Sequence, residues 1–303
     1  MKTSTLFHDY LLMRTHPSLK KETLCFENHL KPFYGSFNLL KVSIQEHSKL
    51  IKYLADKGLE PGTINRIRST MSAMYNVAIR QYTYGDVLRT NPFTAISKIK
   101  FMEKRMPYWD VNSVQKFLDS ERGSHYYPLW LLMLNTGIRI GEAVAVHGKQ
   151  FDQSANILSI DRIWCVVENG FRHETKNSRI RDIGLNKTIQ KEIYPLIQVG
   201  PLFSRKGGDL LRADYVSKKV FPAACKRAGV ENIGCHGMRH TFASNFIMNN
   251  GNIYDLQKIL GHSDIATTER YTKFSRRHQQ RVANVVSFSG NVIHGNFGQN
   301  ATA

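Results

Sequence analysis

The stretch between residues 234 and 273 constrains this chain most strongly, because it sets four reactive side chains at fixed spacings. His236 and Arg239 are three residues apart, which places both on one face of a helix. His262 follows about twenty residues later, and Tyr271 stands nine positions after it. A guanidinium holds phosphate through paired hydrogen bonds, an imidazole moves protons near neutral pH, and a phenol can be a covalent nucleophile. The set predicts phosphoryl transfer through a protein tyrosine.

The charge of the chain predicts the class of its partner. The 303 residues carry a formal net charge of +18, and a polyanion is the usual partner for such an excess. No apolar run has transmembrane length, and the N-terminus lacks the regions of a signal peptide, so we expect no membrane association and a cytoplasmic, nucleoid-associated protein. The four cysteines form no Cys-x-x-Cys pair, which favours free thiols over a zinc knuckle or disulfides.

Two separated boxes of the sequence resemble the signature of the tyrosine recombinases, the phage integrase family. The boxes are Thr136-Gly-Ile-Arg139-Ile-Gly-Glu142, and His236-Gly-Met-Arg239-His240 with the later Leu260-Gly261-His262 and Tyr271. Their order, residue types and spacing agree with the family over roughly residues 105–285. The resemblance implies a site-specific DNA recombinase of integrase type, which cuts and rejoins double-stranded DNA through a 3′-phosphotyrosyl intermediate. That exchange of one phosphodiester for another needs neither metal nor ATP, so we expect no cofactor.

The resemblance also implies roles for the basic residues. Arg139 and Arg239 would bind the non-bridging oxygens of the scissile phosphate, and Tyr271 would attack its phosphorus. Lys176, in a turn between two predicted strands, would protonate the departing 5′ oxygen. His262 would donate a hydrogen bond to the developing charge.

Three roles depend on side-chain contacts that the sequence leaves open. His236 either takes the phenolic proton or holds the phosphate. Arg139 lies between buried segments, where a lone charge is costly, so it needs Glu142 or a bound phosphate as its partner. By resemblance, Glu142 would brace the site by holding His236. His240 is expected to be a core histidine that supports the site. The alternative of a metal pair formed by His236 and His240 lacks a nearby carboxylate or cysteine to complete it.

Hydrophobic periodicity predicts a mainly α fold with a small antiparallel β-sheet, in the α+β class. Residues 1–100 are expected to form a helical, core-binding DNA-binding bundle, residues 101–108 a linker and residues 109–281 the catalytic domain. Residues 282–303 would be a tail that docks on a neighbouring subunit, giving a homotetramer on synapsed sites from a monomer in solution. The chain resembles the two-domain form of the family, without an arm-binding domain.

Basic side chains outside the boxes are candidates for DNA backbone contacts. One helix of the first domain offers three arginines opposite its apolar stripe, and the linker region adds four further cations. The candidates are Arg66, Arg68, Arg80, Lys98, Lys100, Lys104 and Arg105.

Two alternative functions remain open from the residues alone. A type IB topoisomerase uses similar chemistry on one duplex, whereas the apolar segment after Tyr271 favours a recombinase. A catalytically idle DNA-binding protein would not need the complete set of reactive residues.

Overall fold

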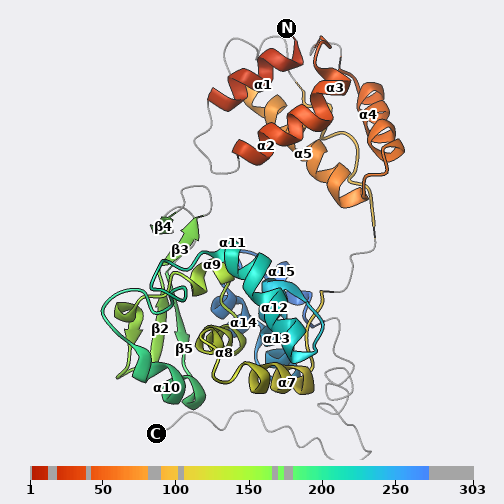
Figure 1. The fold of residues 1–303 in the computed structure, drawn as a ribbon. Helices are drawn as coiled ribbons and strands as arrows, with labels where there is room; N and C mark the ends of the chain where they lie inside the picture. Colours follow the sequence, from red (N-terminus) through yellow and green to blue (C-terminus); the bar gives the residue numbers. More distant parts are fainter. Residues whose placement is uncertain are drawn as a thin grey trace, which may run out of the picture. The chain divides into compact units, whose positions relative to one another are not determined.

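The chain divides into two compact units, Met1–Lys104 and Arg105–Ala303 (Figure 1). The computed structural model describes residues 2–12, 19–38, 42–80, 90–101, 106–165, 170–173 and 180–272. The boundary between the units falls inside the segment that the sequence marks as a linker. Both units are rich in helices, and the second also carries small antiparallel sheets, so the predicted α+β class is confirmed. The predicted docking tail, residues 282–303, lies outside the described residues.

The first unit is a helical bundle around one apolar core. Ser43 caps α4, because its hydroxyl accepts a hydrogen bond from the Glu46 backbone N–H. Leu50, Ile67 and Met71 are among the buried residues that join α4 to the long helix α5. The helices of this unit are α1 Thr3–Leu12, α2 Leu19–Cys25, the π-helical turn Phe26–Leu30, α3 Lys31–Tyr34, α4 Ile44–Asp56 and α5 Pro61–Arg80.

The segment 90–101 is tied along α5 by polar side chains. Asn65 exchanges two hydrogen bonds with the backbone of Ile99, each 3.0 Å long. Arg68 donates to the carbonyls of Ser97, Phe93 and Ile96. One side of α5 is therefore occupied by this chain's own backbone.

The second unit arranges its helices around a central apolar helix, α8. Its elements are α7 Val111–Glu121, α8 Tyr127–Thr136, α9 Ile140–Ala143, β1 Phe151–Asp152, β2 Ile157–Ile160, β3 Arg162–Cys165, β4 Gly170–His173, β5 Arg181–Gly184, α10 Lys187–Ile193, α11 Ala213–Tyr215, α12 Phe221–Ala228, α13 Gly234–Met248, α14 Ile253–Leu260 and α15 Ile265–Glu269. A π-helical turn, Val216–Val220, connects α11 to α12.

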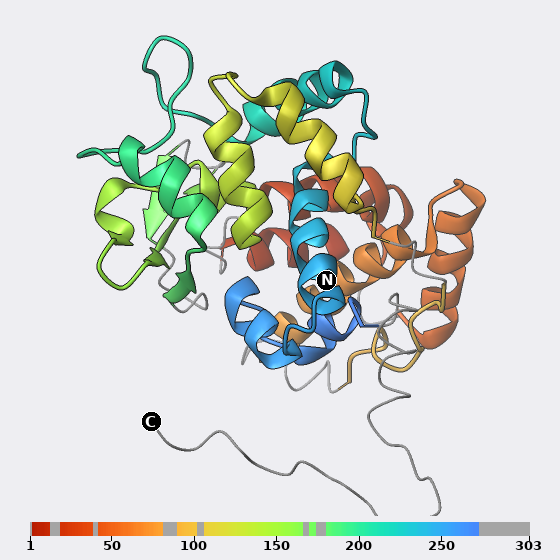
Figure 2. The same ribbon diagram turned by 90° about the horizontal axis from the view of Figure 1, so that it is seen from below.

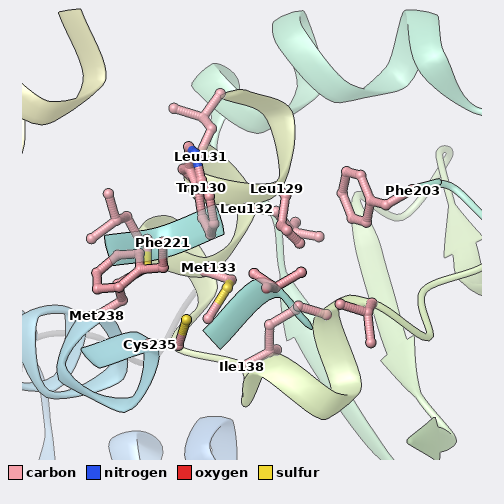
Figure 3. Packing of buried hydrophobic residues seen from close by; sticks show 14 of the residues in the cluster. Leu129, Trp130, Leu131, Leu132, Met133, Ile138, Phe203, Phe221, Cys235 and Met238 are labelled. Atoms are coloured by element: carbon pink, nitrogen blue, oxygen red, sulfur yellow. The ribbon is translucent and has the colours of Figure 1, made fainter. Parts of the chain in front are cut away.

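Helix α8 lies between α10 on one side and α13 on the other, as Figure 2 shows from below. Trp130 is fully buried among Phe117, Phe221 and Tyr126, with ring centroids 6.0, 5.6 and 6.3 Å away. Met133 of α8 lies near Cys235 and Met238 of α13 in the same core (Figure 3). A helix that is apolar on nearly every side must be covered on every side, and this one is.

The strands of the second unit form two small antiparallel sheets. The first has the order β1-β2-β5, with Leu158 opposite Ile183, and both of these side chains are buried in the core. In the second, β3 pairs with β4. The turn predicted to carry Lys176 connects β4 to β5, and residues 174–179 lie outside the described residues.

Candidate active site

Helix α13 carries two of the predicted reactive side chains, His236 and Arg239, together with the predicted supporting residue His240. Its buried face includes Met238 and Arg239, while His236 is exposed and His240 is half-buried. The rings of His236 and His240 stack edge-to-face, with centroids 4.6 Å apart and planes at 87°. The spacing of three and four residues therefore brings these groups to one end of the helix, as the sequence predicts.

Arg239 connects the ends of two other helices. Its side chain is 1% exposed, and its terminal nitrogens donate to the Gly137 carbonyl at 3.0 Å and to the Leu260 carbonyl at 2.6 Å. Gly137 ends α8 in the left-handed conformation, with φ of 66°. Burial, and then the charge of Arg139, lower the pKa of Arg239 to about 9, so the guanidinium stays charged at neutral pH. The Nε atom of Arg239 has no hydrogen-bond partner within the described residues.

Glu142 is the buried carboxylate of the site. It accepts hydrogen bonds from the Arg139 backbone N–H and from Arg139 Nη1, both at 2.8 Å, in a capping arrangement at the start of α9. Arg181 of β5 donates to both carboxylate oxygens, at 2.6 and 3.1 Å. Burial acts to raise the pKa of Glu142, but the hydrogen bonds and charge of Arg181 and then Arg139 outweigh it and hold that pKa below its usual value.

The contacts of Glu142 correct one expectation and add one residue. The expected contact with His236 is not found among the described residues, because both oxygens of Glu142 are taken by arginines. Arg181 also donates through Nε to the Ile259 carbonyl at 2.8 Å, so it ties β5 to the end of α14. Sequence reasoning missed this residue. The signal available was an arginine between Ile180 and Ile183, shortly after the turn that is predicted to contain Lys176.

Tyr271 packs among apolar side chains, and its hydroxyl group forms a hydrogen bond with a histidine. The side chain is 5% exposed and packs with Ile247, Leu256 and Leu260. Its hydroxyl oxygen is 2.9 Å from His240 Nδ1. Burial raises the pKa of Tyr271, while the charges of Arg239, Arg270 and Arg139 act to lower it. The interpretation of His240 as a core histidine therefore misses its main contact.

His262 follows Gly261, which ends α14 in the left-handed conformation with φ of 65°. Its Nδ1 is 2.9 Å from the Thr268 hydroxyl. Burial, followed by the charges of Arg239 and Arg139, lowers the pKa of His262 to about 4, so the ring is neutral at pH 7. When Thr268 donates to Nδ1, the proton of the ring is on Nε2, which can then donate to a ligand.

Most of the predicted DNA-backbone residues that the structure describes are exposed, with one exception. Arg66 and Arg80 on α5, and Lys98 and Lys100 after it, are exposed. Arg68 is 7% exposed and donates to backbone carbonyls, so its placement on an outward, phosphate-facing side of α5 was wrong. Arg68 stands four residues after Ile64 and three before Met71, so it lies on the buried side of α5 and not opposite the apolar stripe. Lys104, Arg105 and Lys176 lie outside the described residues.

Neither a metal cluster nor a membrane span is found within the part of the chain that the structure describes. No three His, Cys, Asp or Glu side chains gather there. No described helix is both long and apolar enough to cross a bilayer. Cys165, Cys225 and Cys235 are buried free thiols, and Cys25 is a partly buried one.

The sequence pattern of the phage integrase family matches residues 104–278, more than half of the chain. The chain belongs to this family. A protein of Pseudomonas phage Pf1 named "Putative integrase" is 29% identical over 230 residues, which are 73% of this chain and 60% of that protein. The chain thus spans less than two thirds of that relative. The tyrosine recombinase XerD of Rickettsia bellii is 25% identical over 288 residues, covering 87% of this chain and 89% of XerD.

Solved structures of integrases share the fold of this family member. The Tn1549 transposon integrase in complex with transposon right-end DNA superposes with a TM-score of 0.75 at 20% identity, covering 93% of this chain and 98% of that one. A lambda integrase dimer on a core site gives a TM-score of 0.65 at 16% identity, covering 89% and 95%. The predicted family is confirmed. The topoisomerase and idle-protein alternatives are not favoured by these relatives.

Proposed function

We propose that this chain cuts and rejoins double-stranded DNA at a specific site, with Tyr271 as the nucleophile. The observation that carries the proposal is the position of Tyr271. Its phenol is held at the α13 end that carries His236 and Arg239, where the charges of Arg239, Arg270 and Arg139 act on it. Cationic groups around a phenol lower the free energy of the phenolate that attack requires. Membership of the family and the recombinases among its relatives support the same reaction.

The two arginines of the signature would contribute differently to phosphate binding. The side chain of Arg139 is 40% exposed, and Glu142 orients its Nη1, so this guanidinium can reach a ligand from the surface. Arg239 is buried with both terminal nitrogens on carbonyls, so it supplies fixed positive charge. Its unpaired Nε–H would gain an acceptor if a phosphate oxygen entered the site. His262 would donate to the phosphate through the ring nitrogen that Thr268 does not hold.

The reaction exchanges one ester bond for another. The Tyr271 oxygen bonds to phosphorus, the bond from phosphorus to the 5′ oxygen breaks, and the leaving oxygen takes a proton. We assign that proton to Lys176. A 5′ hydroxyl from another duplex reverses the step and releases Tyr271. The bonds formed and broken and the transferred proton are all accounted for without ATP or a metal ion.

A nicked duplex tests the proposal. The DNA that flanks the gene would first be footprinted with the full-length protein to find the bound site. In a substrate nicked near the scissile bond, cleavage releases a short strand that carries the 5′ hydroxyl. This strand dissociates and cannot reverse the reaction, so the 3′-phosphotyrosyl adduct accumulates. We expect a denaturation-resistant adduct with the wild-type chain and none with Tyr271→Phe, while both bind the duplex equally. An adduct that survives Tyr271→Phe would reject the assignment.

The same proposal includes assembly and place of action. Residues 1–100 would grip the DNA through exposed cations such as Arg66 and Lys98, and residues 282–303 would dock on a neighbour in a homotetramer. Deleting residues 282–303 should then impair synapsis of two sites more than binding to one. Action on DNA implies a cytoplasmic protein associated with the nucleoid.

A further inference from the structure

Tyr271 and His240 meet across two elements that are distant in sequence. The hydroxyl oxygen of Tyr271 lies 2.9 Å from His240 Nδ1, and the two ring centroids are 5.7 Å apart with planes at 48°. The Tyr271 ring is fixed among apolar side chains of α13 and α14. An O–H in such a pocket that did not donate would be left unpaired at a cost in free energy. The Tyr271 hydroxyl therefore donates to His240 Nδ1, which accepts in the tautomer that carries the ring proton on Nε2.

The ring of His240 is in the state that this direction requires. Its pKa is lowered to about 4, first by burial and then by the positive groups around it. These groups are His236 and Arg239 on its own helix, and Arg270 beside Tyr271. At pH 7 the imidazole is therefore neutral, with one nitrogen free to accept. His236 has no comparable contact, since no hydrogen bond joins it to Tyr271 among the described residues.

We propose that His240, and not His236, accepts the proton of Tyr271 when its oxygen attacks phosphorus. This inference rests on the function proposed above and assigns the base of that same reaction. In the step, the O–H bond of Tyr271 breaks and its proton moves to His240 Nδ1, giving an imidazolium. The oxygen–phosphorus bond forms as the bond from phosphorus to the 5′ oxygen breaks, and the leaving oxygen takes a proton from Lys176. A negatively charged phosphodiester in the site favours the imidazolium, and the proton returns to Tyr271 when the strand is rejoined.

Geometry comes first in choosing a general base, because the acceptor must be within hydrogen-bond reach of the proton. His240 meets this condition before DNA binds, and His236, at the exposed end of the imidazole pair, is left to contact the phosphate. The two roles that the sequence leaves open for His236 are thereby divided between two histidines. The edge-to-face contact of the two rings keeps His240 turned toward Tyr271.

Two substitutions of His240 separate proton transfer from simple placement. His240→Asn keeps an acceptor that can hold the Tyr271 hydroxyl but cannot take its proton at neutral pH, and His240→Ala removes both. We expect adduct formation on the nicked duplex to slow by about 10²–10⁴-fold in each variant, the usual contribution of general acid–base catalysis. Their rates should keep rising with pH above 8, because free phenolate replaces the missing base. Imidazole added to His240→Ala should restore part of the rate.

The controls distinguish this inference from the proposed function. Duplex binding of both variants should match the wild type, and so should the thermal unfolding of His240→Asn. His240→Ala leaves the Tyr271 hydroxyl unpaired and should melt at a lower temperature; if it does not fold, His240→Asn carries the test. A wild-type chain without any adduct contradicts the proposed function itself. A wild-type adduct with His240→Asn reacting within about threefold of it, and with an unchanged pH profile, would overturn the role of His240 alone.

Discussion

Glu142 and Arg181 form a two-bonded ion pair inside the second unit, with N···O distances of 2.6 and 3.1 Å. The Glu142 side chain is fully buried, and that of Arg181 is 9% exposed. Through Glu142, Arg181 also fixes Arg139, and through the Ile259 carbonyl it fixes the end of α14 just before His262. One side chain from the sheet thus connects both signature boxes.

Replacing Arg181 with Met should destabilise the second unit by about 3–5 kcal/mol, because the buried carboxylate of Glu142 loses the charge and the two hydrogen bonds of Arg181. All three tryptophans of the chain, Trp109, Trp130 and Trp164, lie in this unit, so urea unfolding followed by tryptophan fluorescence reports on it alone. Arg122→Gln is the matched control. Its pair with Asp119 is exposed and 4.0 Å long, and its loss should change stability by less than about 0.5 kcal/mol. Equal effects of the two substitutions would contradict the bridging role.

Arg68→Met should loosen the first unit and leave phosphate contacts intact. It removes the donors to the carbonyls of Ser97, Phe93 and Ile96, which we expect to cost about 1–3 kcal/mol. Hydrogen exchange should then speed up across residues 90–101. Arg66→Ala, on the exposed side of the same helix, should instead weaken DNA binding. The slope of the logarithm of the binding constant against the logarithm of salt concentration should become shallower by about one. The opposite pattern would restore Arg68 to the DNA interface.

Gly137→Ala should disturb the site through its backbone. A Cβ at this position would lie 2.4 Å from the Phe242 ring, and its φ of 66° is strained for alanine. Since the Gly137 carbonyl accepts from Arg239, we expect slower adduct formation as well as a loss of about 1–3 kcal/mol. Gly123→Ala shares the left-handed backbone, with φ of 91°, but meets nothing within 4 Å. It should cost stability without slowing the reaction.

Lys176→Ala should block cleavage of an ordinary phosphodiester while duplex binding persists. A substrate with a 5′-bridging sulfur provides a leaving group that needs no proton, so it should react with this variant at close to the wild-type rate. The rate of adduct formation on both substrates measures the effect. Failure of the sulfur substrate to react would remove Lys176 as the acid.

The protein should lose stability as the pH falls from 7 to 5. Burial is the first cause that lowers the pKa values of His47, His240 and His262 to about 4. The unfolded chain, in which each histidine has a pKa near 6.5, therefore binds protons first. The stability is complete above about pH 6.5 and declines through this window toward pH 4. Melting temperatures at pH 7, 6 and 5 measure how steeply stability falls with pH. In His47→Leu, the melting temperature of the first unit should depend less on pH.

The sequence predicted the family and the α+β class, because the signature boxes and the hydrophobic periodicity can be read along the chain. The spacing of His236 and Arg239 acts within one turn of a helix, so their common end of α13 could also be predicted. Helical spacing also puts Arg68 on the same side of α5 as Ile64 and Met71, contrary to the expectation of an outward position, but it does not show which backbone carbonyls cover the guanidinium.

The tertiary structure decided which partner each polar group takes. Arg68 donates hydrogen bonds to carbonyls that are 25 to 29 residues away in the sequence. Arg181 and Glu142 are bonded across a separation of 39 residues, and His240 and Tyr271 across 31. Such contacts are set by how helices and strands pack, and a buried charge or hydroxyl takes whichever partner the packing brings within hydrogen-bond distance. Local sequence fixes the face on which a side chain stands, whereas only the folded chain fixes what stands opposite.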